Sequence, residues 1–543
     1  MWWVCTARTC AEVPQGIANI GVSDARFTTR DGTTLVSRVW RPSGPGAWPT
    51  LLMRQPYGRA IASTVTYAHP HWYASHGYAV VVQDVRGRGC SEGQFGGFAQ
   101  EAADGAETLG WLRSQSWCNG RVGTYGFSYQ GLSQLLSNDL SQLPDALAPA
   151  MAGLDERRHW ASSGDAHWWA LGLGWALQLA AESCRRQANT NGWQAIRSSL
   201  ASGAFLTDGL SLLRQHDPRG MGLAWLQRDP ADPVGWTQHE PLGAIWSRPM
   251  LQIGGWHDPY LDGVLELWHR AHQGNSDQRL RIGAWTHLNW QGGIDRLQLA
   301  FFDRHLKGCE TPRHDKAKPP GELMADMGTG QWCARSPRVS SGQHWGLVSD
   351  GLAAIDASEG VLGTGPSRGT VVLVHDPWRP LPGRGGHLGL DAGVVDRADL
   401  DNRADVACFS SAPFGKATEV LGRPLLELPV CADQPGFDLC VALSVLNSRG
   451  EVRQVSTGVA RFLGASCLTL QTRRVALQPL LLTVQPGERL RLSVGAAAWP
   501  QIAVNPGTGA MPQGPSGMDH RVIGLELHLA GAQLGIHPMV TAN

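Results

Sequence analysis

The stretch RVGTYGFSYQGLSQLL, at residues 121–136, decides the fold of this chain. It opens with a short strand-like run, passes through a turn bounded by glycines at 126 and 131, and continues as a helix-forming segment. A short strand, a sharp turn and a helix in succession are typical of a mostly parallel sheet with helical connections. The stretch therefore predicts an α/β domain with a strand-to-helix turn at Ser128.

The residues before this stretch have the same character. PTLLMRQPYG (49–58) and YAVVVQDVRG (78–87) are nearly continuous apolar runs that end in turn residues. Strands buried on both faces of a parallel sheet have this pattern. EAADGAETLGWLRSQ (101–115) is helix-like, and ARFTTRDGTTLVSRVWRP (25–42) carries an Asp-Gly hairpin signal between two β-rich runs. The alternation supports an α/β fold.

Charge and apolar content exclude several classes of protein. Lysine plus arginine and aspartate plus glutamate both number 46, so the chain lacks the basic charge that a nucleic-acid binder needs. No window reaches the roughly 18 apolar residues of a membrane span, and residues 1–16 lack the regions of a secretory signal. The eleven cysteines, Cys5 and Cys10 included, follow no recurring spacing. We therefore predict reduced thiols and a cytoplasmic protein with no membrane or nucleic-acid partner.

Ser128 is the candidate nucleophile, in Gly126-Phe127-Ser128-Tyr129-Gln130-Gly131. A nucleophilic serine on a tight strand-to-helix turn needs small neighbours, because the turn brings backbones close together. Free N–H groups at the start of the following helix also favour developing negative charge. The sequence departs from the general G-x-S-x-G pattern, since Gln130 stands at the second glycine position and Gly131 comes one residue later. An ordinary glycine turn is the alternative interpretation.

A serine nucleophile needs a histidine base and a carboxylate that orients this histidine. Asp258 follows the strand-like QIGG in IGGWHDPYLDG (253–263), and His287 follows RIGA in RIGAWTHLNW (281–290). In α/β-hydrolases the order along the chain is serine, acid and histidine, each after a strand. Asp258 and His287 both fit this order, and the sequence thus predicts a Ser-Asp-His triad.

Eight segments together resemble one family of enzymes. They are RQPYGR (54–59), VVVQDVRGRGCSEGQF (80–95), SWCNGRVGTYGFSYQG (116–131), GGWHD (254–258), GAWTH (283–287), FFDRHLKG (301–308), HDPWRPLPGRGG (375–386) and VQPGERLRLSVGAAAWP (484–500). In this order they resemble the cocaine esterase-like and X-Pro dipeptidyl-peptidase-like serine hydrolases, which include α-amino-acid ester hydrolases. The G-x-S-Y-x-G pattern of that family also accounts for the displaced glycine.

The resemblance implies a role for each candidate residue. Ser128 would be the nucleophile, His287 the general base and then acid, and Asp258 the orienting carboxylate. The oxyanion hole would consist of the backbone N–H of Tyr129 and the phenol of Tyr57 in the Pro-Tyr turn. A phenol suits this role because its O–H is a good donor on a rigid ring, and losing one such donor typically costs about 10²–10³ in kcat.

Three aromatic residues are expected to bind the substrate. Trp160 and Trp175 resemble the rings that line the acyl pocket in cocaine esterase-like members. Tyr260 stands where such enzymes carry another pocket aromatic. The alternative interpretation is that these rings only hold the helical segment together.

The expected fold class is α/β, with an α/β-hydrolase domain, an inserted helical lid and a C-terminal jelly-roll-like β-sandwich. The middle of the chain is rich in tryptophan and has no clear strand, whereas the part after the linker-like HDKAKPPGE (314–322) consists of short β-rich segments between Gly/Pro turns. The expected boundaries are 17–138 and 246–312 for the two parts of the core, 139–245 for the lid, and 313–543 for the sandwich.

The expected reaction is hydrolysis of an ester or amide bond of a small molecule through an acyl-enzyme. X-Pro dipeptidyl-peptidase and α-amino-acid ester hydrolase activities are the alternatives, and both require carboxylates for a substrate ammonium. After Asp258 only Asp262 is acidic, which favours a neutral ester. The other acidic residues considered for an amine are Glu92, Asp155, Glu156 and Asp165.

No cofactor or metal is expected. The strand before Gly87-x-Gly89 is reminiscent of a dinucleotide loop, but Glu92 stands at the third glycine position. No H-x-x-x-H or paired-cysteine framework supports a metal. A non-catalytic binding protein with the same fold is the remaining alternative, and the presence of all three triad residues argues against it.

Overall fold

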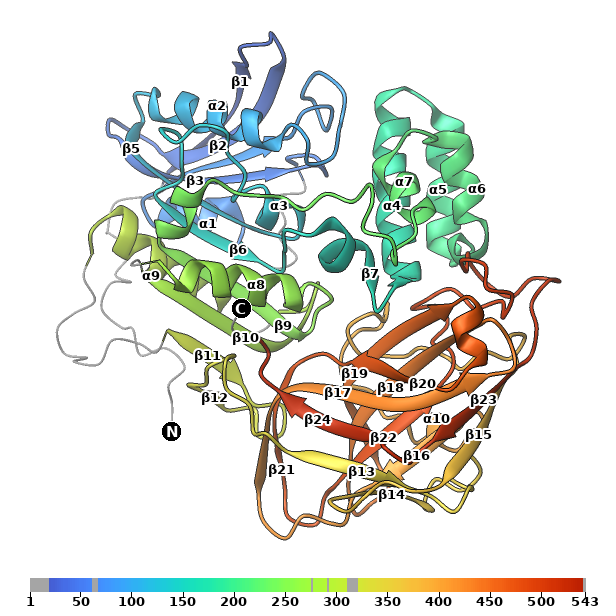
Figure 1. Cartoon of the computed structure of the whole chain (residues 1–543). Helices are drawn as coiled ribbons and strands as arrows, with labels where there is room; N and C mark the ends of the chain where they lie inside the picture. Colours follow the sequence, from blue (N-terminus) through green and yellow to red (C-terminus); the bar gives the residue numbers. More distant parts are fainter. Residues whose placement is uncertain (1–18, 61–66, 275–276, 291–292, 310–320, 541–543) are drawn as a thin grey trace.

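Two large sheets and a group of helices make up the computed structural model, which describes residues 19–60, 67–274, 277–290, 293–309 and 321–540. The first sheet has ten strands and the second has twelve. In Figure 1 the first sheet and its helices lie at upper left, the second sheet at lower right, and α4–α7 stand beside the first and above the second. Cys5 and Cys10 lie outside the described residues.

The first sheet contains the predicted parallel strands. Its strands in spatial order are β1 (Ile20–Thr28), β2 (Thr34–Pro42), β4 (Ala79–Asp84), β3 (Trp48–Gln55), β5 (Cys118–Phe127), β6 (Ala146–Ala150), β9 (Met250–His257), β10 (Gln278–Thr286), β11 (Glu322–Ala325) and β12 (Trp332–Cys333). From β4 to β11 every pair is parallel. Every residue of β4 and β9 is buried, as their mainly apolar sequences indicate.

The hairpin at the start and the helices of this domain also follow the sequence signals. β1 and β2 pair antiparallel, and Gly32 in their turn has a φ of 87°, which glycine adopts without strain. Five helices pack around the sheet: α1 (Pro70–Ser75), α2 (Glu101–Arg113), α3 (Tyr129–Leu132), α8 (Leu261–His272) and α9 (Ile294–Leu306). Of these, α3 is only four residues long, shorter than the sequence suggested.

Two of the expected boundaries differ from the structure. The stretch expected to be a helical insertion from 139 contains β6, which lies inside the first sheet between β5 and β9. Its sequence, ALAPA, is short, contains proline and has no β-branched residue, so it carries no strand signal. The first sheet also extends beyond 313, because β11 and β12 complete its edge. The second sheet begins only at His344.

The helical segment follows β6. It consists of the π-helix η1 (Arg157–Ala161), the small ladder β7 (Ser162–Ser163) and β8 (Ala166–His167), helices α4 (Trp169–Arg186), α5 (Thr190–Ser202), α6 (Phe205–His216) and α7 (Met221–Gln227), and the 3-10 helix η2 (Gly243–Ser247). α4 packs against α5, α6 and α7. It buries Leu173, Leu177 and Ala180 on one face, which accounts for the apolar sequence of this helix.

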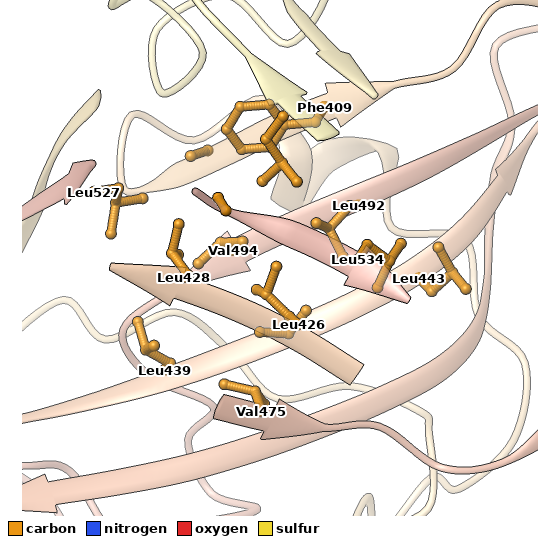
Figure 2. Close-up of a cluster of buried hydrophobic side chains, with 14 of the residues drawn as sticks. Phe409, Leu426, Leu428, Leu439, Leu443, Val475, Leu492, Val494, Leu527 and Leu534 are labelled. Atoms are coloured by element: carbon orange, nitrogen blue, oxygen red, sulfur yellow. The ribbon is translucent and has the colours of Figure 1, made fainter. Parts of the chain in front are cut away.

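The second sheet is almost entirely antiparallel. Its strands are β13 (His344–Val348), β14 (Gly360–Gly363), β15 (Thr370–His375), β16 (Val406–Ser410), β17 (Thr418–Ala432), β18 (Gly436–Leu446), β19 (Val452–Leu463), β20 (Gln471–Ala476), β21 (Leu480–Val484), β22 (Arg489–Gly495), β23 (Ile523–His528) and β24 (Gln533–His537). Two short helices, α10 (Ala398–Asp401) and η3 (Ala465–Leu468), accompany them. Figure 2 shows part of the core, where Leu426 and Leu428 of β17 lie among aliphatic side chains of neighbouring strands.

Two further expectations concern membranes and thiols. Among the helices that the structure describes, none is long and apolar enough to cross a membrane. The nine cysteines within the described ranges are all free thiols.

Candidate active site

The candidate catalytic side chains lie at the carboxyl ends of parallel strands. Ser128 directly follows β5, Asp258 directly follows β9 and His287 directly follows β10. Tyr57 comes two residues after β3, the neighbour of β5. Because parallel strands end at the same edge of a sheet, residues far apart in the sequence meet there. This arrangement is the one that the order of the three motifs predicts.

The turn that carries Ser128 is strained. The φ and ψ angles of Ser128 are 58° and −126°, a conformation that a residue with a side chain rarely adopts. A Cβ atom at Gly126 would lie 2.4 Å from the Cβ of Gln130, and one at Gly131 would lie 2.7 Å from the carbonyl oxygen of Ala150 in β6. Glycine is therefore required at both 126 and 131. The second glycine stands one residue later than in the general pattern, because the start of the helix packs against β6 at Gly131.

Gln130 occupies the position where the general pattern has glycine, and it ties the turn to its neighbours. Its side-chain amide donates to Gln55 Oε1 at the end of β3, at 3.1 Å, and its Oε1 accepts from the backbone N–H of Phe127, at 3.3 Å. These bonds hold the nucleophile turn against the strand that leads to Tyr57. Since α3 has only four residues, the backbone N–H of Tyr129, rather than a long helix dipole, is the donor that this turn offers.

Asp258 and His287 form the acid–histidine pair. His287 Nδ1 lies 2.6 Å from Asp258 Oδ2. The other oxygen, Oδ1, accepts from the backbone N–H of Tyr260 at 2.8 Å. Asp258 is completely buried and His287 is partly exposed. A buried carboxylate on Nδ1 holds the proton there and leaves Nε2 free to accept another.

Tyr260 connects this pair to the nucleophile. Its ring stacks on the His287 ring, with centroids 4.8 Å apart and planes 27° apart. Burial raises the pKa of the Tyr260 phenol, nearby Asp258 and Tyr57 raise it further, and a hydrogen-bonding interaction with the Ser128 side chain opposes part of that rise. The ring of Phe127, next to Ser128, also packs on His287 at 5.2 Å. The structure therefore places Ser128 and His287 on the same rim of the sheet.

Two donors are available for an oxyanion. The Tyr57 hydroxyl accepts a hydrogen bond from the indole N–H of Trp175, at 3.1 Å. Burial raises the pKa of Tyr57 to about 12, so the phenol keeps its proton at neutral pH. The Tyr129 side chain points away, since its hydroxyl donates to Gly97 O at 2.9 Å and lies 3.1 Å from Glu101 Oε1. Among the described residues, nothing accepts the proton of Tyr57 or the backbone N–H of Tyr129.

The three predicted pocket aromatics lie together. The Tyr260 ring meets the Trp160 ring edge-on at 4.8 Å, and the Trp160 and Trp175 rings are 6.3 Å apart. Two rings that the sequence did not single out join them: Trp168 lies 5.5 Å from Tyr260, and Trp225 lies 5.5 Å from Trp175. The abundance of tryptophan between 160 and 236 was the available signal, but it did not say which rings face the site.

The second domain supplies two polar contacts that could not be predicted from the sequence. Gln478 Nε2, between β20 and β21, donates to the backbone carbonyl of Asp258 at 2.6 Å. Arg423 of β17 forms an ion pair with Asp262 of α8. The first contact holds the turn that follows β9 and the second holds the start of α8, although both come from the other domain.

A metal site was not expected. Within the described ranges, one group of side chains has donors close enough to share an ion: Cys431 of β17 with Glu526 and His528 of β23. These residues are partly or fully exposed, and they lie on the second sheet, away from the strand ends that carry Ser128 and His287.

Both the catalytic part and the C-terminal part of the chain match known protein families. Residues 31–289 match the profile of the X-Pro dipeptidyl-peptidase (S15 family), and residues 372–524 match that of the X-Pro dipeptidyl-peptidase C-terminal non-catalytic domain. The chain is 28% identical over 545 residues to cocaine esterase of Rhodococcus sp. (strain MB1 Bresler), and the alignment covers 90% of this chain and 93% of the relative. The chain is thus a serine hydrolase that has the S15 catalytic domain and the C-terminal domain of X-Pro dipeptidyl-peptidases and is a homologue of cocaine esterase.

Solved structures share the fold over nearly the whole chain. An aminopeptidase from the marine sediment archaeon Thaumarchaeota archaeon has a TM-score of 0.71 and 19% identity, covering 96% of this chain and 97% of its own. An α-amino acid ester hydrolase has a TM-score of 0.69 and 19% identity, with the same coverage. Similarity at this level of identity concerns the fold alone. The predicted family, the mixed α/β catalytic domain and the sheet-rich C-terminal domain of this serine hydrolase are thus confirmed.

Proposed function

We propose that this serine hydrolase cleaves neutral carboxylic esters of small molecules through an acyl-enzyme on Ser128. The observation that carries the proposal is the 2.6 Å contact between His287 Nδ1 and Asp258 Oδ2, beside Phe127 and Tyr260 at the nucleophile turn. A histidine held in this way has its Nε2 free to accept the proton of a serine hydroxyl.

Each step uses a group at this rim. Nε2 of His287 takes the proton of the Ser128 hydroxyl while the oxygen attacks the ester carbonyl. The carbonyl oxygen becomes an oxyanion, which the Tyr57 O–H and the Tyr129 N–H stabilise. As the tetrahedral intermediate collapses, His287 gives its proton to the leaving alcohol. Water then attacks the acyl-enzyme with His287 again as base, and this step releases the carboxylic acid and restores Ser128.

The charges around the site favour a neutral substrate. Binding an α-amino ester or an X-Pro peptide requires a carboxylate that is free to meet an ammonium group. Asp262, the nearest acidic residue in sequence after Asp258, is paired with Arg423. The other acidic candidates have their own partners or lie in an exposed turn: Glu92 accepts from Thr34 N–H, Asp155 pairs with Arg158, Glu156 pairs with His239, and Asp165 is exposed between β7 and β8.

The finer architecture belongs to the same proposal. The helices α4–α7 would serve as a lid over the acyl pocket, which Trp160, Trp175 and Tyr260 would line. The second sheet would fold as a jelly-roll-like sandwich that supports the catalytic domain of an α/β-hydrolase. The contact of Trp175 with Tyr57 and the packing of Trp168 beside Tyr260 support this assignment.

A comparison of three substrate classes tests the proposal. The value of kcat/KM is measured for a neutral phenyl ester, the matching α-amino ester and an Xaa-Pro anilide, with Ser128→Ala as the control. We expect the neutral ester to exceed both amine substrates at least tenfold and the variant to lose all measurable turnover. Faster cleavage of the Xaa-Pro anilide or of the α-amino ester would overturn the choice of substrate, and undiminished activity of Ser128→Ala would overturn the mechanism.

A further inference from the structure

The Trp175 indole and the Tyr57 phenol form a hydrogen bond whose direction is fixed by chemistry. The indole N–H can only donate, so the Tyr57 oxygen is the acceptor of the 3.1 Å contact. The phenol then has one proton left, and no described residue accepts it. The bond therefore occupies a lone pair of the phenol oxygen and restricts rotation of the remaining O–H.

The position of Trp175 is itself well determined. Its ring packs against Trp225 of α7, with centroids 5.5 Å apart, and against Trp160 of η1, at 6.3 Å. One turn further along α4, the carbonyl oxygen of Leu179 accepts from Arg88 Nη1 at 2.9 Å. The stack of rings and the tie to the loop after β4 fix the direction in which the indole N–H points.

The same helix is attached to the second domain. The backbone N–H groups of Trp169 and Ala170, the first residues of α4, donate to the carbonyl oxygens of Gln501 and Pro500, at 2.8 and 3.1 Å. α4 is thus held at its start by the C-terminal domain and near its end by the catalytic domain. Trp175 lies between these two attachments.

We infer that Trp175 is a positioning residue that directs the Tyr57 hydroxyl proton towards the oxyanion, so that the helical segment completes the oxyanion hole. This role goes beyond lining the acyl pocket, and it rests on the proposed function of Tyr57. A donor bonded to the phenol oxygen also polarises the O–H and makes it a better donor to a developing negative charge. The benefit arises in the transition state, so it should raise kcat more than it lowers KM.

The test is a double-mutant cycle in the full-length protein. Trp175→Phe removes the N–H and keeps an aromatic ring, and Tyr57→Phe removes the hydroxyl. Trp193→Phe is the matched control, because it removes an indole from α5 of the same helical segment and leaves the rings around Trp175 and the bond to Tyr57 in place. The kcat and KM for a neutral ester are measured for each variant and for the Trp175→Phe/Tyr57→Phe pair, after circular dichroism has established that each is folded.

We expect Tyr57→Phe to lower kcat about 10²–10³-fold and Trp175→Phe to lower it about 5- to 20-fold with KM changed less than about twofold. In the Tyr57→Phe background the Trp175→Phe substitution should change kcat less than about twofold, because the hydroxyl through which Trp175 acts is absent. Trp193→Phe should stay within about twofold of the wild type.

Two results would overturn the inference. If Trp175→Phe lowers kcat equally in both backgrounds, or raises KM and leaves kcat unchanged, Trp175 acts as a pocket wall and not through Tyr57. If the wild type itself turns over no ester, the proposed function fails and the inference fails with it. The two cases are distinguishable, since only the first leaves an active wild type.

Discussion

The two sheets of this chain differ in the direction of their strands, and this difference decides where the polar chemistry gathers. In the ten-stranded sheet β3, β5, β9 and β10 run parallel, so all four end at one edge and deliver Tyr57, Ser128, Asp258 and His287 there. In the twelve-stranded sheet nearly all neighbours are antiparallel, so their ends alternate between opposite edges. The core cluster that Figure 2 shows in part is mostly aliphatic, with Phe409 among its side chains.

The antiparallel sheet nevertheless reaches the active site. Gln478 supports the backbone of Asp258, and Arg423 neutralises Asp262 on the helix that follows. The family description calls the C-terminal domain non-catalytic, and none of its side chains is needed as acid, base or nucleophile here. The first sheet thus presents the proposed catalytic side chains, and the second domain holds the turn that carries Asp258.

The largest expected effect comes from a change in the catalytic domain that leaves its shape intact. In Asp258→Asn the Oδ1 atom can still accept from the Tyr260 N–H, but an amide NH₂ then faces His287 Nδ1. The imidazole must turn to the tautomer with its proton on Nε2, which cannot accept the Ser128 proton. We expect kcat to fall about 10⁴-fold. The rate of hydrolysis of a phenyl ester at saturating concentration measures this loss of kcat. A variant with more than a tenth of the wild-type kcat would contradict the triad.

A substitution in the core of the second sheet should lower the stability of the protein and leave its kcat unchanged. Leu426 of β17 is completely buried among aliphatic neighbours. Leu426→Ala removes three carbons and leaves a cavity, at a cost of about 3 kcal/mol in the free energy of unfolding. The midpoint of urea denaturation measures this cost. The kcat per titrated active site should remain within about twofold of the wild type, and a tenfold fall would show that this core is not separate from the chemistry.

The third prediction concerns the pH dependence of stability, which two buried histidines near the contact between the domains should influence. Burial lowers the pKa of His257, at the end of β9, to about 4, and that of His387, from the second domain, to about 3. Both pKa values lie below the unfolded value of about 6.5, so the stability from keeping these histidines neutral is complete above pH 6.5 and is lost as the pH falls towards 4. We expect a loss on the order of 2 kcal/mol per histidine between pH 7 and 4.5.

Thermal denaturation across this pH range tests the effect. His387→Gln should flatten the decline between pH 6.5 and 4.5, whereas His344→Gln, at the exposed start of β13, is the matched control and should follow the wild type. A decline of equal slope in the wild type and in His387→Gln would show that the buried histidine at the domain contact does not govern acid stability.

The smallest expected effect tests the link between the sheets. Gln478→Leu removes the donor to the Asp258 carbonyl and leaves that buried oxygen without its 2.6 Å partner. We expect a kcat about tenfold lower, because the acid turn loosens, together with a loss of about 1–2 kcal/mol in stability. Gln478→Glu is a control of similar shape that also lacks the amide donor. Equal losses of kcat in both variants would trace the effect to the lost amide donor, and wild-type kcat in Gln478→Leu would refute the supporting role.

Much of the catalytic domain could be predicted from local sequence. The runs at 49–58 and 78–87 are nearly continuously apolar because the strands are buried on both faces, and the Asp-Gly pair at 31–32 marks a real hairpin. β6 was not predicted, because ALAPA has no strand signal of its own and is held in place by β5 and β9 on either side. Tertiary pairing overrides weak local preference in such a segment.

The candidate site could be predicted only where its residues follow strands. Ser128, Asp258 and His287 each stand directly after an apolar run, and the parallel order of those runs brings them together. Gln478 has no such signal, because its role depends on the packing of one domain against the other, which sequence spacing does not encode. The hydrogen bond of Trp175 to Tyr57 was equally hidden, since the abundance of tryptophan does not indicate which indole N–H meets a phenol.

The most direct test of this account is site mapping with a fluorophosphonate, which reacts with an activated serine and forms a stable adduct. The full-length protein is labelled at neutral pH, digested and mapped by mass spectrometry, with Ser128→Ala and Asp258→Asn in parallel. We expect one adduct per chain on the peptide that contains Ser128, none there in Ser128→Ala, and much slower labelling in Asp258→Asn. A folded wild type that stays unlabelled, or that carries its adduct on another residue, would contradict the claim that the parallel strands assemble a working triad.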